Sequence, residues 1–72
     1  MKNNEDICNL FGKKLKEERL KRNINQEELA FKSKLDRSFL SEVENGVKNP
    51  SLRTLYKLST ALDMELKDLL DL

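Results

Sequence analysis

Apolar residues recur at helical spacing from the beginning of the chain. Ile7, Phe11 and Leu15 repeat every four residues, which predicts an amphipathic helix over residues 4–22. Asn23 follows this stretch, and asparagine tolerates the left-handed conformation that often ends a helix. We therefore expect the chain to turn at Asn23, and we expect residues 1–4, which precede the apolar repeat, to be disordered.

Two shorter helices are predicted in the middle of the chain. Asn25 with Glu28 three residues later is typical of a helix start, and the segment QEELAFKS that follows is expected to bury Leu29 and Ala30. After the turn Ser33-Lys34-Leu35, Asp36 is expected to cap a helix of about ten residues. Leu40 and Val43 should anchor that helix, and Asn45-Gly46 should end it.

The last part of the chain predicts two more helices and no strand. Ser51 is a good capping residue for a helix that runs to about Leu62, and a short helix is expected from Glu65. No segment alternates between apolar and polar residues in the way a strand does. The pattern predicts an all-α fold of five helices in which residues 1–72 form a single domain.

Composition narrows the classes of function. A chain of 72 residues is near the size at which one core is only marginally sufficient, so a homodimer is expected. One cysteine, Cys8, and no histidine leave no disulfide, no metal site and no evident general base, which argues against an enzyme and a cofactor. No apolar run has the roughly 20 residues of a membrane span, and the polar start MKNNED does not resemble a signal peptide, so we expect a cytoplasmic protein.

Charge is distributed unevenly along the chain. Residues 13–53 hold 11 basic and 7 acidic residues, a net charge of +4, whereas residues 54–72 have a net charge of −2. Such a division suits a protein that presents a basic face to an anion and its other end to a partner.

The segment LDRSFLSEVENG combines a polar beginning with an apolar anchor. A short turn brings two helices close together, and the small Ala30 suits their point of approach. Leu40 and Val43 would hold the second helix, leaving Arg37, Ser38 and Ser41 on its free side. Such a helix can enter the major groove of DNA, which is about 12 Å wide. Arg37 is the best candidate to read a base, because a guanidinium binds guanine through two hydrogen bonds.

Residues 25–49, NQEELAFKSKLDRSFLSEVENGVKN, resemble the helix-turn-helix of the Cro and lambda-repressor-like proteins, the XRE family. The segments FGKKLKEERLKRNINQEELA and NPSLRTLYKLSTALDMELKDLL resemble the first two and the last two helices of that family. The segment LAFKSKLDRSFLSEVENG is also similar to the controller proteins of restriction-modification systems. The resemblance implies a compact five-helix lambda-repressor-like domain with its helix-turn-helix at about residues 26–45.

The resemblance also implies roles for individual residues. Arg37 and Ser38 fall on base-contacting positions, and Ser41 and Glu42 lie beside them; Glu42 either accepts a hydrogen bond from a cytosine or repels phosphate. Contacts to phosphate are expected from Gln26, which should also brace the recognition helix, and from Asn25, Lys48, Asn49 and Ser51. In the family the positions of Arg19 and Glu44 form a largely buried ion pair, and we predict the same pair here.

Three positions depart from the family pattern. Lys34 stands where the family usually has glycine, so either the turn differs or a left-handed backbone costs about 1–2 kcal/mol. Phe39 replaces the tyrosine of controller proteins, and its ring either contacts DNA or folds back on the domain. Ser59 replaces an alanine and is expected to bond to a carbonyl one turn earlier.

Family members bind palindromic operators as two-fold dimers. The dimer surface is expected near the C-terminus, because this region has more apolar residues than one small core is expected to bury; the alternative is that all of them are core. These residues are Leu52, Tyr56, Met64, Leu66 and Leu69. We expect an autoregulatory transcription factor on double-stranded DNA, and the similarity to controller proteins suggests control of a restriction-modification system. The rival is an antitoxin or a bridging module of the same fold.

Overall fold

The computed structural model describes the chain from residue 4 to residue 72, and its side chains from residue 7. This part of the chain has five helices and no strand. They are α1 (Asn4–Lys21), α2 (Gln26–Ser33), α3 (Arg37–Glu44), α4 (Leu52–Ala61) and α5 (Leu66–Leu69). The predicted all-α fold is therefore confirmed. Of the residues expected to be disordered, Asn4 instead begins α1, and residues 1–3 lie outside the described residues.

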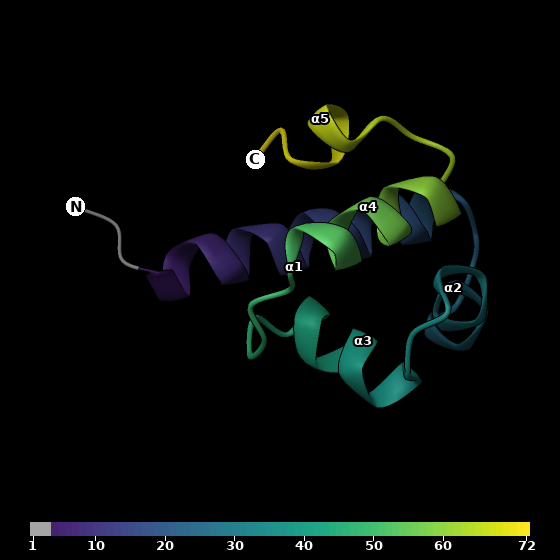
Figure 1. Ribbon diagram of the computed structural model, residues 1–72, viewed down its shortest axis with the longest axis horizontal. Coiled ribbons are helices and arrows are strands. Elements are labelled where there is room, and N and C mark those ends of the chain that lie inside the picture. The colour runs from purple at the N-terminus through teal and green to yellow at the C-terminus, as the bar shows by residue number, and fades with distance from the viewer. Residues whose placement is uncertain (1–3) are drawn as a thin grey trace.

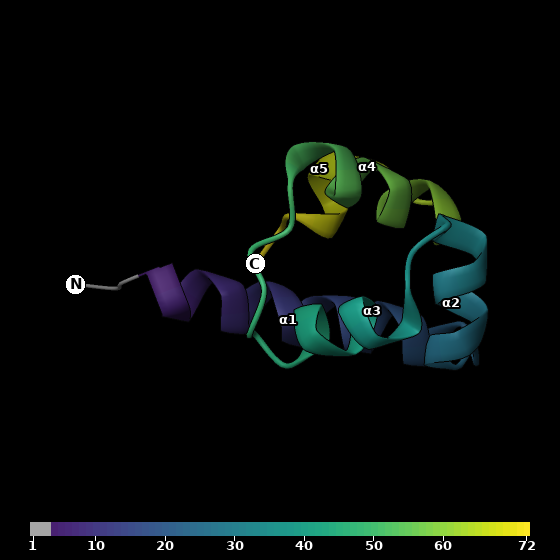
Figure 2. The ribbon, with the colours of Figure 1, turned by 60° about the horizontal axis from the view of Figure 1, so that its bottom comes forward.

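The helices form two layers (Figures 1 and 2). In one layer α3 packs alongside the long helix α1, and in the other α5 packs on α4. Between the layers α2 closes one end, where it contacts both α3 and α4. This arrangement leaves one side of α3 at the edge of the molecule.

The core lies between these layers. Nine apolar side chains are buried among the described residues, and full burial of one leucine contributes about 1.5–3 kcal/mol. They are Phe11, Leu15, Leu29, Ala30, Leu40, Val43, Leu58, Leu62 and Leu69. Every helix contributes at least one of them, so the fold depends on all five helices. Ile7, the first residue of the predicted apolar repeat, is 50% exposed and does not belong to the core.

Two of the expected helix caps are present. The side chain of Asn25 accepts a hydrogen bond from the backbone N–H of Glu28 at 2.8 Å, and Ser51 accepts one from Thr54 at 3.1 Å. Asp36 occupies the capping position of α3, as predicted, but its side chain makes no capping hydrogen bond. The start of α3 is instead positioned by the turn before it.

That turn contains a left-handed residue. Lys34 has φ 59° and ψ 42°, and its backbone N–H donates to the carbonyl of Phe31 at 3.2 Å. Leu35 then donates to Ala30 at 2.9 Å and is half-buried against the core. The chain thus keeps the turn for which the family uses glycine and accepts the backbone strain of a side chain at Lys34.

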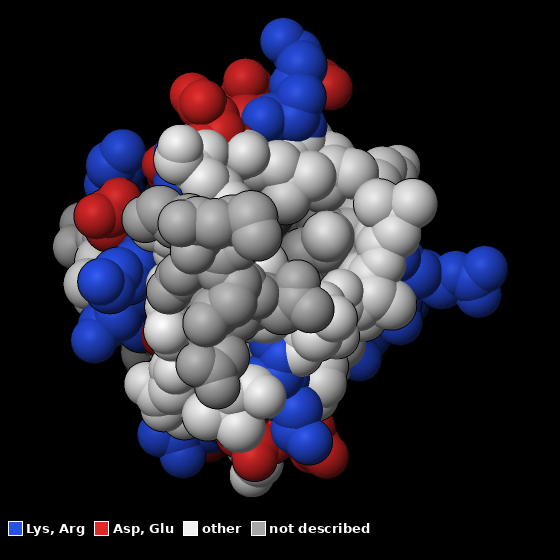
Figure 3. All heavy atoms as spheres, turned by 90° about the vertical axis from the view of Figure 1, so that its left-hand side faces the viewer, with Lys and Arg blue, Asp and Glu red and all other residues white. Residues whose placement is uncertain are grey.

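Viewed from the N-terminal end of α1, many of the described residues that surround the grey, undescribed part are uncharged, and most of the Lys, Arg, Asp and Glu side chains in view lie toward the rim (Figure 3). An apolar hollow of about 260 Å³ lies beside α1, and its lining includes Phe11, Pro50, Leu55 and Leu70. Cys8 also lines it and is partly buried. None of the described helices is long and apolar enough to span a bilayer.

Candidate nucleic-acid interface

The helix α3 presents a polar edge to solvent. Leu40 and Val43 are fully buried and fix one side of the helix, while Arg37 and Ser38 in its first turn are exposed. Because these two pairs lie on different sides of a helix of 8 residues, burial of the apolar side leaves the polar side facing outward. The helix lies along one edge of the molecule with its first turn next to α2 (Figure 1).

The predicted base-contacting residues lie together. Arg37, Ser38, Ser41 and Glu42 line one shallow hollow of about 330 Å³, and Gln26 from the start of α2 completes it. Each is exposed or half-buried. The structure therefore brings the first turn of α2 and the outer side of α3 into one polar surface.

A buried ion pair fixes α3 to α1. Arg19 Nε donates to Glu44 Oε2 at 2.7 Å and Arg19 Nη2 donates to Glu44 Oε1 at 3.0 Å, with both residues buried. Arg19 Nη1 also donates to the carbonyl of Ile24 at 3.0 Å. The hydrogen-bonded carboxylate raises the pKa of Arg19 above its ordinary value, so the guanidinium stays charged. The pair expected from the family resemblance is thus present, and two parallel hydrogen bonds give it a fixed geometry.

Gln26 extends this pair to α2. Its Nε2 donates to Glu44 Oε1 at 3.0 Å, so one carboxylate receives hydrogen bonds from residues of both α1 and α2. A side-chain amide nitrogen has two N–H groups, and this bond uses one of them. Gln26 thus braces α3 while it lines the polar hollow.

Close contact between α1 and the end of α3 adds to this fixation. A side chain at Gly12 would collide with the backbone carbonyl of Glu44 and would lie 2.7 Å from that of Val43. Gly46 follows α3 with φ 78° and lies against the side chain of Asn9. A larger residue in place of Gly46 would displace that side chain. The two glycines let α3 lie directly on the backbone of α1.

The loop after α3 carries the predicted phosphate-binding residues. Lys48, Asn49 and Ser51 are all exposed, and this loop lies at the opposite end of α3 from Arg37. The Ser51 hydroxyl is already engaged: it accepts from the Thr54 N–H and donates to Thr54 Oγ1 at 3.0 Å. Lys48 is therefore the strongest anion-binding side chain of the loop.

The ring of Phe39 is half-buried and packs against the core. Of the two alternatives for this residue, the structure thus favours packing on the domain. The hydrogen bond expected of Ser59 is present, since its hydroxyl donates to the carbonyl of Tyr56 at 2.8 Å. Neither replacement disturbs the fold.

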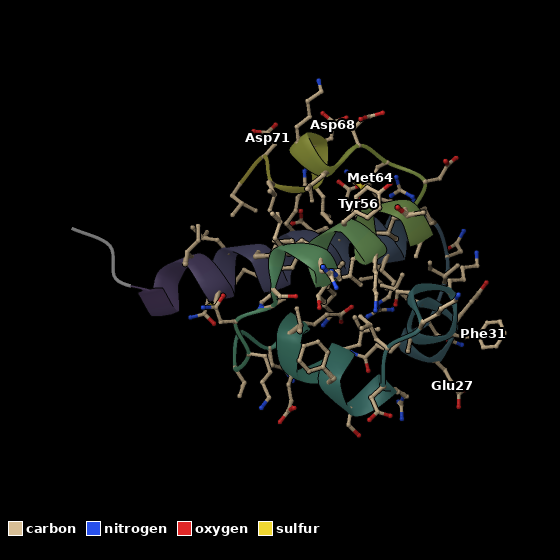
Figure 4. The ribbon with its side chains drawn as sticks, in the orientation of Figure 1. Glu27, Phe31, Tyr56, Met64, Asp68 and Asp71 are labelled. Carbon is tan, nitrogen blue, oxygen red and sulfur yellow. The ribbon has the colours of Figure 1, made fainter. Side chains whose placement is uncertain are left out.

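The surface of α4 and α5 is apolar in part. Leu52 is 70% exposed and Tyr56 is 63% exposed, whereas Met64 and Leu66 are half-buried (Figure 4). Leu69 is completely buried in the core, so its assignment to a dimer surface was wrong. Its position on the inner side of α5 lets it hold that helix on α4 instead.

A second buried carboxylate was not anticipated. Glu18 is only 7% exposed, and its Oε1 accepts from Arg22 Nη1 at 2.8 Å. Lys14 and Lys21 also lie near its other oxygen, at 3.4 and 3.3 Å. The hydrogen bond from Arg22 is the main reason that the pKa of Glu18 falls to about 2.

Arg22 connects this cluster to the far side of the molecule. Its Nε donates to the carbonyl of Leu62 at 2.9 Å, where α4 ends. The spacing of Glu18 and Arg22, one helical turn apart, was the available signal for their pairing, whereas nothing in the sequence indicated the contact with Leu62.

The side chains of the polar hollow are suited to molecular recognition. No group of three His, Cys, Asp or Glu side chains that could hold a metal occurs in the part of the chain described. The polar hollow instead combines a guanidinium, hydroxyls, an amide and a carboxylate. These are the groups that form hydrogen bonds with the edges of bases in the major groove.

Comparison with known proteins identifies the family. The profile described as "Helix-turn-helix" matches residues 15–69. Control protein C.BamHI of Bacillus amyloliquefaciens is 48% identical over 63 residues, which are 86% of this chain and 78% of that protein. The crystal structure of the restriction-modification controller protein C.AhdI from Aeromonas hydrophila matches with a TM-score of 0.85 and 47% identity, over 86% of this chain and 94% of that one.

The structure of a similar protein has been solved in complex with DNA. The tetramer of the restriction-modification controller protein C.Esp1396I in complex with its natural 35-base-pair operator matches with a TM-score of 0.81 and 27% identity, over 89% of this chain and 88% of that one. The chain described here thus belongs to the XRE family of helix-turn-helix proteins, which are DNA-binding transcription regulators and not enzymes.

Proposed function

We propose that this protein is a homodimeric, sequence-specific transcription regulator that reads a palindromic operator with α3. The observation that supports this most strongly is the polar first turn of α3. Arg37 and Ser38 are exposed there, while the buried Arg19–Glu44 pair fixes the other end of the helix. A rigid helix with an exposed polar start can place side chains against base edges without losing much conformational entropy.

Arg37 is proposed to read guanine. Its guanidinium can donate to O6 and N7 of one base at the same time, and such a pair discriminates by about 1–3 kcal/mol against another base. Ser38 and Ser41 then contact neighbouring base edges or phosphates. Glu42 accepts from a cytosine amino group or, by repelling phosphate, restricts how the helix docks.

Phosphates are proposed to bind on both sides of α3. Gln26 has a second amide N–H that its bond to Glu44 leaves available, and Asn25 lies beside it at the start of α2. Lys48, Asn49 and the backbone N–H of Ser51, whose hydroxyl is bonded to Thr54, would hold the DNA backbone at the other end of α3. Contacts of this kind set the position of the protein on the duplex and carry no sequence information of their own.

Dimerisation is proposed to involve the exposed side of α4 and the adjacent part of α5, with Leu52 and Tyr56 at its centre and Met64 and Leu66 beside them. Two-fold dimers of this kind place two recognition helices one turn of DNA apart, about 34 Å. Control would follow from concentration, because monomers pair as the protein accumulates and the dimers then occupy the operator, which we place in the protein's own promoter.

The similarity to C.BamHI and C.AhdI supports a more specific role, the control of a restriction-modification system. In this role the protein would regulate the genes of a restriction endonuclease and a methyltransferase. The presence of both genes beside the gene of this protein would support the assignment, and a neighbouring toxin gene would favour an antitoxin instead.

A gel-shift titration tests the proposed function. The probe is the DNA upstream of the protein's own gene, and the control is a shuffled duplex of the same composition. We expect a shift at submicromolar protein that is selective for the upstream DNA and weakens as salt rises. The absence of a selective, salt-dependent shift at micromolar protein would overturn the DNA-binding role and favour a protein-interaction module.

A further inference from the structure

The exposed side of α4 has charge of opposite sign on its two flanks. Tyr56 and Thr60 are shared by two hollows of the surface. One hollow, about 240 Å³, lies toward the end of α2 and is lined by Lys32, Lys34 and Lys57. The other, about 520 Å³, lies toward α5 and is lined by Asp63, Glu65 and Asp68. We call these the basic flank and the acidic flank.

Most of these charges have no partner within the described residues. Lys32 lies 3.7 Å from Glu28 of its own helix, but Lys34 and Lys57 are in no ion pair of the described chain. The same holds for Glu65 and Asp68, and all four side chains are exposed. Figure 4 shows Asp68 at the outer side of α5, away from the core. Each flank is therefore available to charges of a partner.

An apolar strip adjoins the two flanks, and Tyr56 lines the hollows of all three. Leu52, Tyr56 and Leu66 line a third, wide hollow along α4, together with Ser51 and Arg53. Its lining is mainly apolar, and Leu52 and Tyr56 are the most exposed large apolar residues of α4. An apolar strip between polar edges is the usual composition of a protein interface, with charged residues at the rim.

We infer that a second copy of this chain covers this surface, with the basic flank of each copy against the acidic flank of the other. A two-fold interface contains every contact twice, so a surface with one positive and one negative flank can satisfy both flanks with its own copy. The inference rests on the proposed homodimer and adds what holds the two copies in register. The opposite arrangement, with like flanks together, would be repelled.

The arrangement makes pairing depend on salt. Ion pairs at the exposed rim of an interface are screened when the Debye length falls to about 3 Å at 1 M salt. Dimerisation should therefore weaken at high salt even without DNA, although the apolar strip is unaffected. High salt would then weaken operator binding in two ways, because it weakens both the contacts to phosphate and the dimer itself.

Charge reversal tests this pairing. One variant carries Lys34→Glu with Lys57→Glu, and the other carries Glu65→Lys with Asp68→Lys. Sedimentation equilibrium at low salt should show that each variant alone dimerises about tenfold or more weakly than the wild type, because like charges then face each other twice. An equimolar mixture should dimerise more tightly than either variant, because only the mixed pair has opposite charges at both flanks.

Controls separate this effect from net charge and from misfolding. Lys13→Glu with Lys16→Glu, on the exposed side of α1, changes the net charge as Lys34→Glu with Lys57→Glu does and should leave dimerisation as in the wild type. Circular dichroism melts establish that each variant is folded, and the single changes Lys57→Glu and Asp68→Lys replace any double variant that is not. Recovery in the mixture cannot arise from misfolding, because the same two chains are present.

The outcomes discriminate between the proposals. A mixture that dimerises no better than its components, or variants that pair like the wild type, would overturn the charge-paired arrangement and leave the dimeric DNA-binding function intact. A wild-type chain that stays monomeric at every concentration would overturn the arrangement together with the dimer. Weak pairing of each variant alone and tight pairing of the mixture would support it.

Discussion

Lys34 shows how a single residue can depart from a family pattern while the backbone keeps it. With φ 59° it adopts the left-handed conformation for which glycine is best suited. The sequence identified the position but left open whether the turn or the stability would change. The turn is kept because Leu35 must enter the core and Leu40 must follow it, and packing of these residues outweighs a local strain of about 1–2 kcal/mol.

Replacing this lysine with glycine should therefore stabilise the protein. Lys34→Gly relieves the strain but adds freedom to the unfolded chain, so we expect the free energy of unfolding to rise by about 0.5–1 kcal/mol. Urea denaturation measures it. Lys34→Ala, which removes the charge and keeps the strain, is the matched control; equal stability of the two variants would show that Lys34 is not strained.

Arg37 and Lys48 lie at opposite ends of α3 and are expected to act differently. Arg37→Ala should abolish discrimination at one base pair, at a cost of about 1–3 kcal/mol on the operator and less on random DNA. Lys48→Ala should weaken binding to all sequences alike and lower the salt slope by about one. Fluorescence anisotropy with operator and random duplexes measures both, and equal losses on the two duplexes for Arg37→Ala would remove its base-reading role.

The exposure of Phe31 could not be predicted from the sequence. This residue lies within the apolar pattern of α2, yet it is 85% exposed and points away from the molecule, whereas its neighbours Leu29 and Ala30 are buried (Figure 4). In a helix of 8 residues a single turn decides which residues face inward, and adjacent apolar residues cannot be assigned by periodicity alone.

At the scale of helices, most boundaries could be predicted because side chains set them. Asn25 and Ser51 start α2 and α4 with the hydrogen bonds expected of capping residues. Asp36 has the right chemistry for the same role but makes no such bond, since a cap depends on the direction of the entering chain as well as on residue type. The position of α3 depends on tertiary contacts instead.

The fixation of α3 to α1 can be measured as stability. Glu44→Ala would leave the buried guanidinium of Arg19 without its carboxylate, and we expect the free energy of unfolding to fall by about 3–5 kcal/mol. The double change Arg19→Met with Glu44→Leu removes both charges and should recover much of this loss. A double variant less stable than Glu44→Ala would show that the pair itself, and not the stranded charge, accounts for the effect.

The cluster around Glu18 predicts a pH dependence. Because its pKa is lowered from 4.5 to about 2 in the folded protein, the unfolded chain binds more protons between these values. The stability that Glu18 contributes is thus fully present above about pH 4.5 and is lost as pH falls toward 2. Urea denaturation of the wild type and Glu18→Gln should show a difference at pH 7 that shrinks at pH 3.

A matched control for this series is Glu17→Gln, which removes one negative charge from an exposed position of the same helix. The double variant of Glu18→Gln with Arg22→Ala measures how much of Glu18's contribution to the free energy of unfolding depends on the hydrogen bond from Arg22. A deficit of Glu18→Gln that is equally large at pH 7 and pH 3 would contradict this explanation.

At the scale of the whole molecule, the all-α architecture and the exposed polar side of α3 could be predicted, but the division between core and surface at the C-terminal end could not. Leu69 and Leu52 have the same side chain, yet one is fully buried and the other is 70% exposed. The difference arises from how α5 folds back on α4, which depends on the connecting residues and on Arg22 bonding to Leu62. Contacts of this range leave no local pattern in a sequence.

The proposed dimer would hold two copies of α3 in fixed positions for DNA binding. The core fixes α3 on α1, and the Glu44 carboxylate joins α3 to both α1 and α2. In the proposed dimer a second copy would cover the exposed surface of α4. Each part would be in place before DNA is bound, so little ordering should accompany binding.

Selection of bound duplexes from a random DNA pool tests whether a dimer of this protein reads a symmetric site through Arg37. Successive rounds with the wild-type protein, followed by sequencing, should enrich a two-fold symmetric site whose half-sites have centres about 10–10.5 base pairs apart, and Arg37→Ala should lose the preference at one position of each half-site. Enrichment of no sequence, or of an asymmetric site that Arg37→Ala selects equally well, would contradict the account.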